Sequence, residues 1–210
     1  GTLHLSASTP TTGSGILNQA ASADTEFSLP RMAIRFATKP IGPGILILFA
    51  GYNTYDQVYN PTPATEIVYD IDSYVYGATG MANFGPLQLW LQMSKAQNPR
   101  NFTNDVPGPA GLFRYGAYGV TVGGTTTIYD SELFSWQTMV VYKASPAISV
   151  ALMYGASAEE LAIPGTKWES DVDTWALAVP ITICPGFQII PQYGYIDFGT
   201  VETNGVPATP

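Results

Sequence analysis

Apolar and polar residues alternate along several stretches of the chain, each about nine to eleven residues long, the length of a strand that crosses a bilayer. Between Leu87 and Lys95 the odd positions hold three leucines and a methionine, whereas the even positions include Gln88, Gln92 and Ser94. A period of two is typical of a β-strand with one apolar and one polar face. With 21 glycines and 17 prolines spread along the chain, long helices are disfavoured, and the pattern predicts an all-β fold.

Tight turns rich in Pro and Gly join these stretches into four expected hairpins. We expect them at Leu29–Thr38 with Ile45–Thr54, Ile67–Thr79 with Leu87–Lys95, Glu132–Tyr142 with Ile148–Ala156, and Asp173–Ile183 with Phe187–Asp197. Longer segments, expected as loops, separate the hairpins at 55–66, 96–130 and 157–172. This alternation of short turns and long segments favours an outer-membrane barrel, in which the short turns face the periplasm.

The composition supports a membrane-spanning barrel. Charged residues make up only 11% of the chain, against roughly 25% in soluble domains, yet no run approaches the ~20 apolar residues of a membrane-spanning helix. Tyr and Trp lie mostly toward the expected strand ends, as in the aromatic girdles of barrels, although ordinary β packing also favours them. The predicted fold is therefore all-β: a transmembrane, antiparallel, up-and-down barrel with at least eight strands.

Residues 1–210 are expected to form a single β-barrel domain. The segments 1–28 and 199–210 are expected to be loop-like, although Thr2–Ser8 could form a short strand. Loop-like ends suggest an internal section of a larger barrel of about 16 strands, within the range of such proteins. Segment 96–130 could hold two more strands, for example around Tyr115–Val122, or could be a surface loop or a loop that narrows the pore.

The charge balance and the absence of motifs exclude several other functions. A net charge of −8 argues against a nucleic-acid partner, which would require a basic face. His4 and Cys184 are the chain's one histidine and one cysteine, and neither a metal site nor a disulfide framework is expected. No catalytic or phosphate-binding motif occurs, so neither an enzyme nor a cofactor is predicted.

The last expected hairpin, 174–198, resembles the penultimate region of the homotrimeric porins of sulfate-reducing bacteria. Those porins have a similar strand, a Pro-Gly turn and a strand ending in Gly-Tyr-x-Asp. The stretches Asn83–Pro86, Ser135–Trp136 and Met153–Gly155 fit the same pattern, so that the resemblance covers roughly residues 81–199. It implies a trimer in the bacterial outer membrane. Those porins usually finish with a strand that ends in an aromatic residue, whereas this chain ends in residues that read as a loop.

Together these features predict a porin, a water-filled channel for passive diffusion of ions and small hydrophilic solutes, in contact with the lipid bilayer of the outer membrane. On the expected register the candidate pore-lining residues are Arg31, Arg35, Asp70, Asp72, Gln88, Gln92, Gln188 and Gln192. Opposed basic and acidic clusters in a narrow lumen would set a transverse field and tune ion selectivity. Two alternatives remain open: a non-channel structural or surface-interaction barrel, and a soluble secreted β-sandwich that binds a carbohydrate or a partner.

Overall fold

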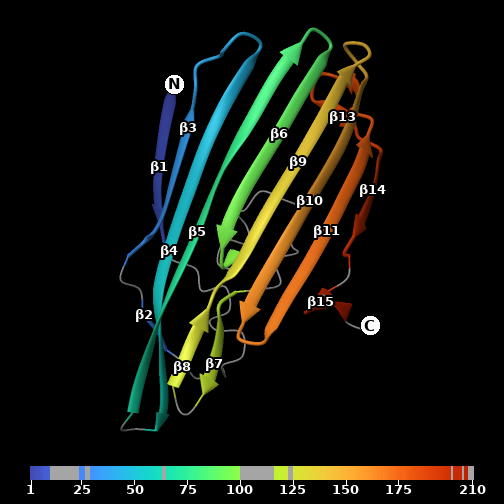
Figure 1. Ribbon diagram of the computed structural model, residues 1–210. Coiled ribbons are helices and arrows are strands. Elements are labelled where there is room, and N and C mark those ends of the chain that lie inside the picture. The colour runs from blue at the N-terminus through green and yellow to red at the C-terminus, as the bar shows by residue number, and fades with distance from the viewer. Residues whose placement is uncertain are drawn as a thin grey trace.

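The structure is a computed structural model that describes residues 1–9, 24–26, 29–62, 65–99, 116–122, 125–199, 201–204 and 206–207. Most of these residues lie in β-strands, and none of the described segments forms a helix with the length and hydrophobicity needed to cross a bilayer. The strands (Figure 1) are β1 Thr2–Ser8, β2 Asp24–Glu26, β3 Arg31–Ala37, β4 Gly44–Thr62, β5 Thr65–Phe84, β6 Leu87–Gln97, β7 Tyr118–Val122, β8 Thr125–Tyr129, β9 Ser131–Lys143, β10 Ser149–Ile163, β11 Thr166–Ala178, β12 Ile181–Cys184, β13 Phe187–Ile189, β14 Gln192–Asp197, β15 Val201–Thr203 and β16 Val206–Pro207.

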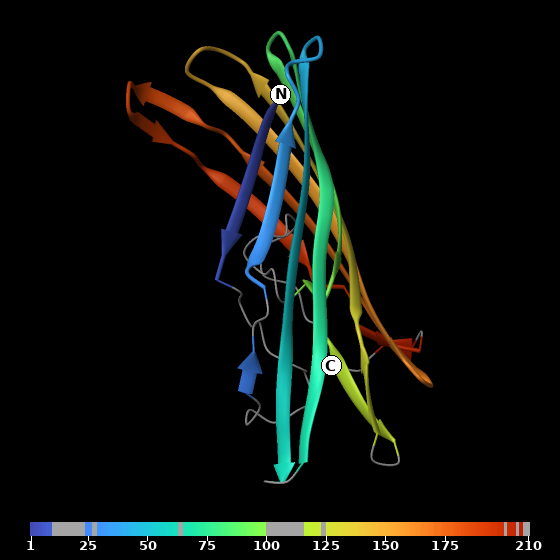
Figure 2. The ribbon, with the colours of Figure 1, turned by 90° about the vertical axis from the view of Figure 1, so that its left-hand side faces the viewer.

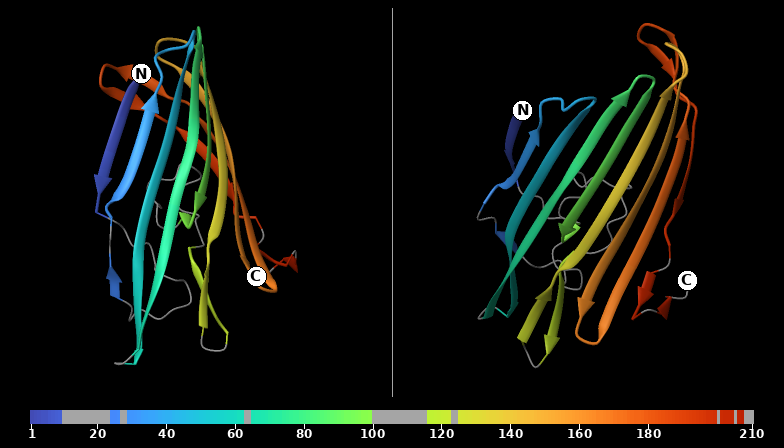
Figure 3. Two further views of the ribbon diagram at one scale, coloured as in Figure 1. Left: turned by 60° about the vertical axis from the view of Figure 1, so that its left-hand side comes forward. Right: turned by 45° about the horizontal axis from the view of Figure 1, so that its top comes forward.

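One large sheet contains most of the strands and runs up and down. Its neighbours follow the order β1, β3, β4, β5, β6, β9, β10, β11, with β14 beside β11, and each pair is antiparallel. β2 pairs with β4, and β15 pairs with β11 and β16. The predicted all-β antiparallel architecture is confirmed. The sheet is curved and twisted (Figures 2 and 3), and no pairing among the described residues joins its edge strands β1 and β14.

The central strands are longer than predicted. β4 has 19 residues and β5 has 20, so most of the loop expected at 55–66 is strand. Segment 157–172 likewise continues β10 and β11, which meet at a turn where Gly165 has a φ of 78°. The expected long loops are wrong at both places. Glu169 and Asp171 occupy alternate positions of β11, and charged residues at alternate positions fit a strand whose two faces differ.

The predicted fourth hairpin is divided by two prolines. Because proline lacks a backbone N–H, it interrupts a ladder. β11 ends before Pro180 and β14 begins after Pro191, while β12 and β13 form a separate two-stranded sheet between them. The Val179 N–H donates to the Pro191 carbonyl oxygen at 2.9 Å and bridges the interruption.

Further strands lie where only loops or open alternatives were expected. β7 and β8 form a hairpin within 96–130, so the possibility of two more strands there is confirmed for the described part; residues 100–115 lie outside it. β1, β2, β15 and β16 occupy the segments expected to be loop-like, and Thr2–Ser8 is the strand that the sequence allowed.

Paired residues on neighbouring strands share a face, so the register divides the sheet into two faces. The inner face carries Asn53 of β4 and its partner Ser73 of β5, both with 0% exposure. The outer face carries the other, alternate residues of each strand, including Tyr52 of β4 and its partner Tyr74 of β5. All buried side chains of two hydrophobic clusters on the sheet, one around Ile71 and one around Val75, lie on the inner face.

Candidate functional site

The outer face near the short turns is covered by exposed apolar side chains, which we call the apolar band. Leu91 of β6 is 47% exposed and Leu152 of β10 is 53% exposed. No charged side chain occurs on this face among the described residues between the short turns and the aromatic row defined below. Prominent members of the band are Leu3, Leu5, Met32, Ile34, Phe36, Leu46, Leu48, Leu89, Leu91, Val150, Leu152 and Leu177. An apolar surface of this extent on a soluble monomer would be unusual.

Aromatic side chains border the band on its far side and form what we call the aromatic row. Its members are Tyr52, Tyr74, Tyr76, Trp136, Tyr154, Trp175 and Tyr195. Neighbouring rings contact one another, with centroids 5.3 Å apart for Trp136 and Tyr154 and 6.0 Å apart for Tyr74 and Tyr76.

The aromatic row crosses the strands obliquely. Tyr52 pairs with Tyr74 in one register position, whereas Tyr154, Trp175 and Tyr195 are aligned in another, roughly six residues nearer the short turns. At ~3.4 Å per residue and ~4.8 Å between strands, this displacement means that the strands are tilted by about 40° from the perpendicular to the row. Strands of membrane barrels are tilted by a similar angle to the membrane normal.

Beyond the aromatic row the outer face becomes acidic, and we call this zone the acidic rim. It contains Asp56, Asp70, Asp72, Glu132, Glu160, Glu169, Asp171 and Asp173. The Tyr154 hydroxyl donates to an Asp173 carboxylate oxygen at 3.0 Å, and the Tyr52 hydroxyl donates to Asp72 in the same way. Row and rim are therefore joined by hydrogen bonds.

Two lysines of the acidic rim are already paired. The Lys95 Nζ lies 2.8 Å from Glu132, and the Lys167 Nζ lies 2.8 Å from Glu169 and 2.9 Å from Glu160. The hydrogen bond with Glu169 and, to a smaller extent, the one with Glu160 raise the pKa of Lys167. These pairs are exposed and contribute little to stability, and the unbalanced carboxylates leave the rim negative.

The predicted lining placed the arginines and the aspartates on one face, but the register places them on opposite faces of the sheet. Arg35 pairs with Phe49 on the inner face, whereas Asp72 pairs with Thr54 on the outer face. Asp70 follows Asp72 onto the acidic rim, and Arg31 shares the inner face with Arg35. The sequence interpretation assumed that apolar residues face outward all along β5, but beyond the aromatic row the apolar residues face inward.

The structure places most of the predicted glutamines on the inner face. Gln88 and Gln92 lie on β6 and Gln192 lies on β14, all in inner-face register. Gln188 is exposed on the separate β12–β13 hairpin. Alternation within each strand was sufficient to find the first three, whereas Pro191 interrupts the strand between Gln188 and Gln192.

Other inner-face residues at the level of the apolar band were missed by the sequence interpretation. Thr79 and Gln137 occupy the register position of the predicted Gln92 on the two strands beside β6, and the Oγ atoms of Ser94 and Ser135 lie 2.8 Å apart. His4, Ser6 and Ser8 alternate with Leu3 and Leu5 on β1. This alternation of polar and apolar residues was the sequence signal that could have placed His4 on the inner face.

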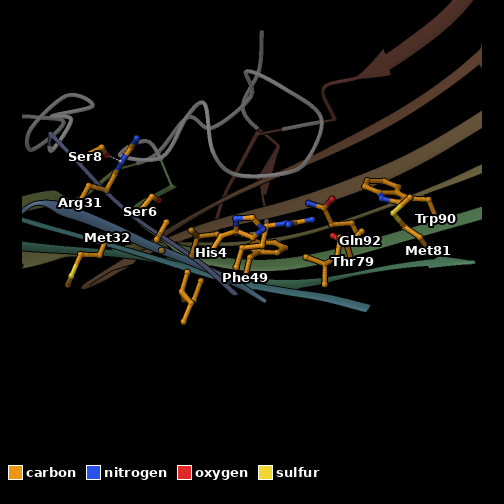
Figure 4. Close-up of a pocket in the computed structure, with 17 residues that line it drawn as sticks. His4, Ser6, Ser8, Arg31, Met32, Phe49, Thr79, Met81, Trp90 and Gln92 are labelled. Atoms are coloured by element: carbon orange, nitrogen blue, oxygen red, sulfur yellow. Dashed lines mark hydrogen bonds between the residues drawn. The ribbon is translucent and has the colours of Figure 1, made fainter. Parts of the chain in front are cut away.

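A pocket of about 560 Å³ opens on this polar part of the inner face, between β1 and β6. Figure 4 shows His4, Gln92 and Trp90 on one side of the sheet and Met32 on the other. The polar lining consists of His4, Ser6, Ser8, Arg31, Arg35, Thr79 and Gln92. The Arg31 Nε donates to the Ser8 Oγ at 3.1 Å.

Beyond the aromatic row the inner face carries buried apolar side chains, and the β7–β8 hairpin packs against some of them. Tyr55, Tyr69 and Ile71 form a buried cluster with Ala117, and Ile128 of β8 packs against it. On the other side, the Tyr118 ring lies 5.3 Å from the Trp168 ring of β11. The hairpin therefore contacts inner-face side chains of both β5 and β11.

Asn98 and Asp130 fix the ends of the segment that contains this hairpin. The Asn98 side chain is fully buried, and its Nδ2 donates to Asp130 at 2.7 Å and to the Asp72 carbonyl oxygen at 2.8 Å. Asn98 has a positive φ of 49°, which asparagine tolerates better than most residues. Partial burial raises the pKa of Asp130, and the hydrogen bond from Asn98 opposes that rise.

No group of three or more His, Cys, Asp or Glu side chains in the described part of the chain is arranged to hold a metal ion. The arrangement instead separates two surfaces. Over the part of the wall nearest the short turns, one surface is apolar and the other is polar with basic side chains.

Comparison with known proteins identifies no family. No family model matches the chain, and no curated protein matches it. A solved structure of the outer membrane channel DcaP of Acinetobacter baumannii is similar, with a TM-score of 0.48 and 12% identity, over 92% of this chain and 57% of that one. A similarity at this level carries no weight for function, and the resemblance to porins of sulfate-reducing bacteria finds no support in these comparisons.

Proposed function

We propose that this chain forms the wall of a water-filled channel in the bacterial outer membrane, for passive diffusion of ions and small hydrophilic solutes. The observation that supports this most strongly is the pair of opposed faces beside the aromatic row. The apolar band would face lipid, and the inner face, on which His4, Ser6 and Ser8 are exposed, would face water. The oblique course of the row matches the strand tilt of a membrane barrel.

The proposed pore-lining residues are those of the predicted set that lie in inner-face register. They are Arg31, Arg35, Gln88, Gln92 and Gln192. Asp70 and Asp72 are excluded from this set because they lie on the acidic rim. With the acids outside and the arginines inside, the lumen would favour anions.

The proposal is tested by recording single channels of the purified protein in a planar bilayer. Ohmic steps would support the channel, and steps in groups of three would support the trimer that the resemblance implies. Protein that inserts in folded form but carries no current would contradict the proposal and favour a structural barrel. A protein that stays monomeric and soluble without detergent would contradict both.

The role of the arginines is tested by selectivity. Replacing Arg31 and Arg35 together with alanine is expected to shift the reversal potential in a salt gradient toward cation preference. Lys95→Ala provides the control, because Lys95 lies on the outer face. An unchanged reversal potential in the double variant would refute the assignment of these two residues to the lumen.

A further inference from the structure

We infer that the inner-face pocket between β1 and β6 binds small organic anions that combine a carboxylate with an apolar body. The inference rests on the proposed channel, because solutes would reach this pocket from the lumen. It specifies a solute class that a general diffusion pore does not require. Its volume of about 560 Å³ lies within the range of small-molecule sites.

The pocket is basic, although the chain is acidic. Two of the eight Lys and Arg residues of the chain and its single histidine line the pocket, and no Asp or Glu among the described residues does. His4 pairs with Arg35 across β1 and β3, so the imidazole and the guanidinium arise from adjacent positions. No carboxylate of the described residues forms an ion pair with Arg35. The Arg35 guanidinium is therefore available to an anion.

Gln92 supplies a second polar contact at the other end of the pocket. Its side chain is only 7% exposed, and its Nε2 has no hydrogen-bond partner in the part of the chain that the structure describes. A buried amide donor without a partner is costly, and a ligand oxygen in the pocket would remove that cost. Arg35 and Gln92 lie three strands apart, which corresponds to about 14 Å between backbones at ~4.8 Å per strand. Side chains of this length leave room for a small ring or a short chain between them.

Apolar side chains form the floor between these two polar ends. Phe49 pairs with Arg35, and Met81 pairs with Trp90 at the next inner-face position after Thr79 and Gln92. The Phe49 ring lies close over Gly77, where an added Cβ would be 2.5 Å from the ring. A hydrated inorganic anion gains nothing from such a floor, whereas an organic body buries apolar surface on it.

The test measures binding to the full chain in nanodiscs by saturation-transfer NMR, separately from conductance. The probes are cyclohexanecarboxylate, its neutral amide of the same shape, and acetate. We expect the carboxylate to bind at least about tenfold more tightly than the amide, since hydrogen bonds to charged groups contribute that much. Acetate, which lacks the apolar body, is expected to bind least. Equal binding of acid and amide, or of cyclohexanecarboxylate and acetate, would overturn the inference.

Variants assign the binding to this pocket. Arg35→Gln should abolish the preference for the acid, Arg35→Lys should retain most of it, and Gln92→Ala should weaken acid binding severalfold, as expected for one hydrogen bond. Lys143→Gln is the matched control, and empty nanodiscs correct for partition into lipid. Retention of the full preference by correctly folded Arg35→Gln would overturn the site.

Conductance of the same preparation separates this inference from the proposed function. A conducting protein without acid preference would overturn the inference and leave the channel. A protein that binds the acid through Arg35 but carries no current would overturn the channel and leave the site.

Discussion

The two zones of the sheet, on either side of the aromatic row, use the same strands with opposite arrangements. On the side of the short turns, β5 directs Ala78 and Gly80 outward into the apolar band, while Thr79 lies on the inner face. Beyond the row, the same strand directs Asp70 and Asp72 outward, while Ile71 is buried inside. The far zone therefore resembles a water-soluble protein with a core, and the near zone resembles the wall of a membrane channel.

This difference shows what a period of two can and cannot indicate. Alternation identifies a strand and separates its two faces, but it does not say which face meets water. The solvent around each zone decides that, and in the proposed channel the aromatic row would mark the change of solvent. Substitutions placed in matched positions of the two zones can test whether this boundary is real.

The largest effect is expected from Ile71→Ala in the inner core of the far zone. Ile71 is 1% exposed and packs with Tyr55 and Tyr69, so the cavity should lower the free energy of unfolding by about 2–5 kcal/mol. Gln137→Ala, on the inner face of the near zone, should change it by about 0.5 kcal/mol or less because that face meets water. Urea titration of protein in lipid vesicles measures both. Similar losses would mean that the inner faces do not differ.

The next effect is a charge on the outer face. Leu91→Arg in the apolar band should cost about 2–4 kcal/mol, as arginine does near the middle of a bilayer. Ala158→Arg lies on the same face beyond the row, next to Asp171 in the pairing strand, and should cost almost nothing. The same vesicle titration applies. If Leu91→Arg were tolerated as well as Ala158→Arg, the apolar band would not be embedded in lipid.

A smaller effect should distinguish the two faces of one strand within the near zone. At Gly77 an added Cβ would lie 2.3 Å from the Met93 carbonyl oxygen, whereas at Gly80 nothing lies within 4 Å. Gly77→Ala should destabilise the protein by about 1–3 kcal/mol through overpacking. Gly80→Ala on the outer face should be neutral or slightly stabilising. A neutral Gly77→Ala would show that the inner wall relaxes around this position.

The smallest effect concerns Asp130 and is a dependence on pH. Because its pKa is raised in the folded protein, its contribution to stability is present at low pH and is lost as pH rises through the raised value. Asp130→Asn keeps an acceptor for the Asn98 amide but cannot ionise. The variant should therefore not lose this stability as the pH rises just above the ordinary pKa range of carboxylates. Unfolding free energies between about pH 4 and 7 measure it. A variant with the wild-type pH dependence would exclude Asp130 as the group responsible.

Near the short turns, the sequence was sufficient to predict the strands and to separate their two faces. Leu87–Lys95 was placed almost to the residue, and its glutamines lie on the inner face as the alternation requires. It was not sufficient for the far zone, where the alternation predicted Asp70 and Asp72 on the same face as the arginines, whereas the register places them on the opposite face. Inside and outside are set by register with neighbouring strands, and no single strand carries that information.

The inner pocket shows the same limit. Arg35, Gln92 and His4 are far apart in sequence, and only the order β1, β3, β4, β5, β6 brings them to one surface. His4 was dismissed because a lone histidine without a cysteine cluster is not a metal site, which says nothing about anion binding. The contact of β7–β8 with the inner face was equally out of reach, because it depends on the curvature of the sheet.

The hydrogen bonds from Tyr52 to Asp72 and from Tyr154 to Asp173 have a consequence for the surrounding lipid. In the proposed channel, each would join a ring at the edge of the hydrocarbon to a carboxylate that must remain hydrated. In the proposed channel, sinking would carry those carboxylates into hydrocarbon, and rising would expose the leucines of the band. The protein therefore holds a fixed depth, and a bilayer of unmatched thickness must itself thicken or thin around it.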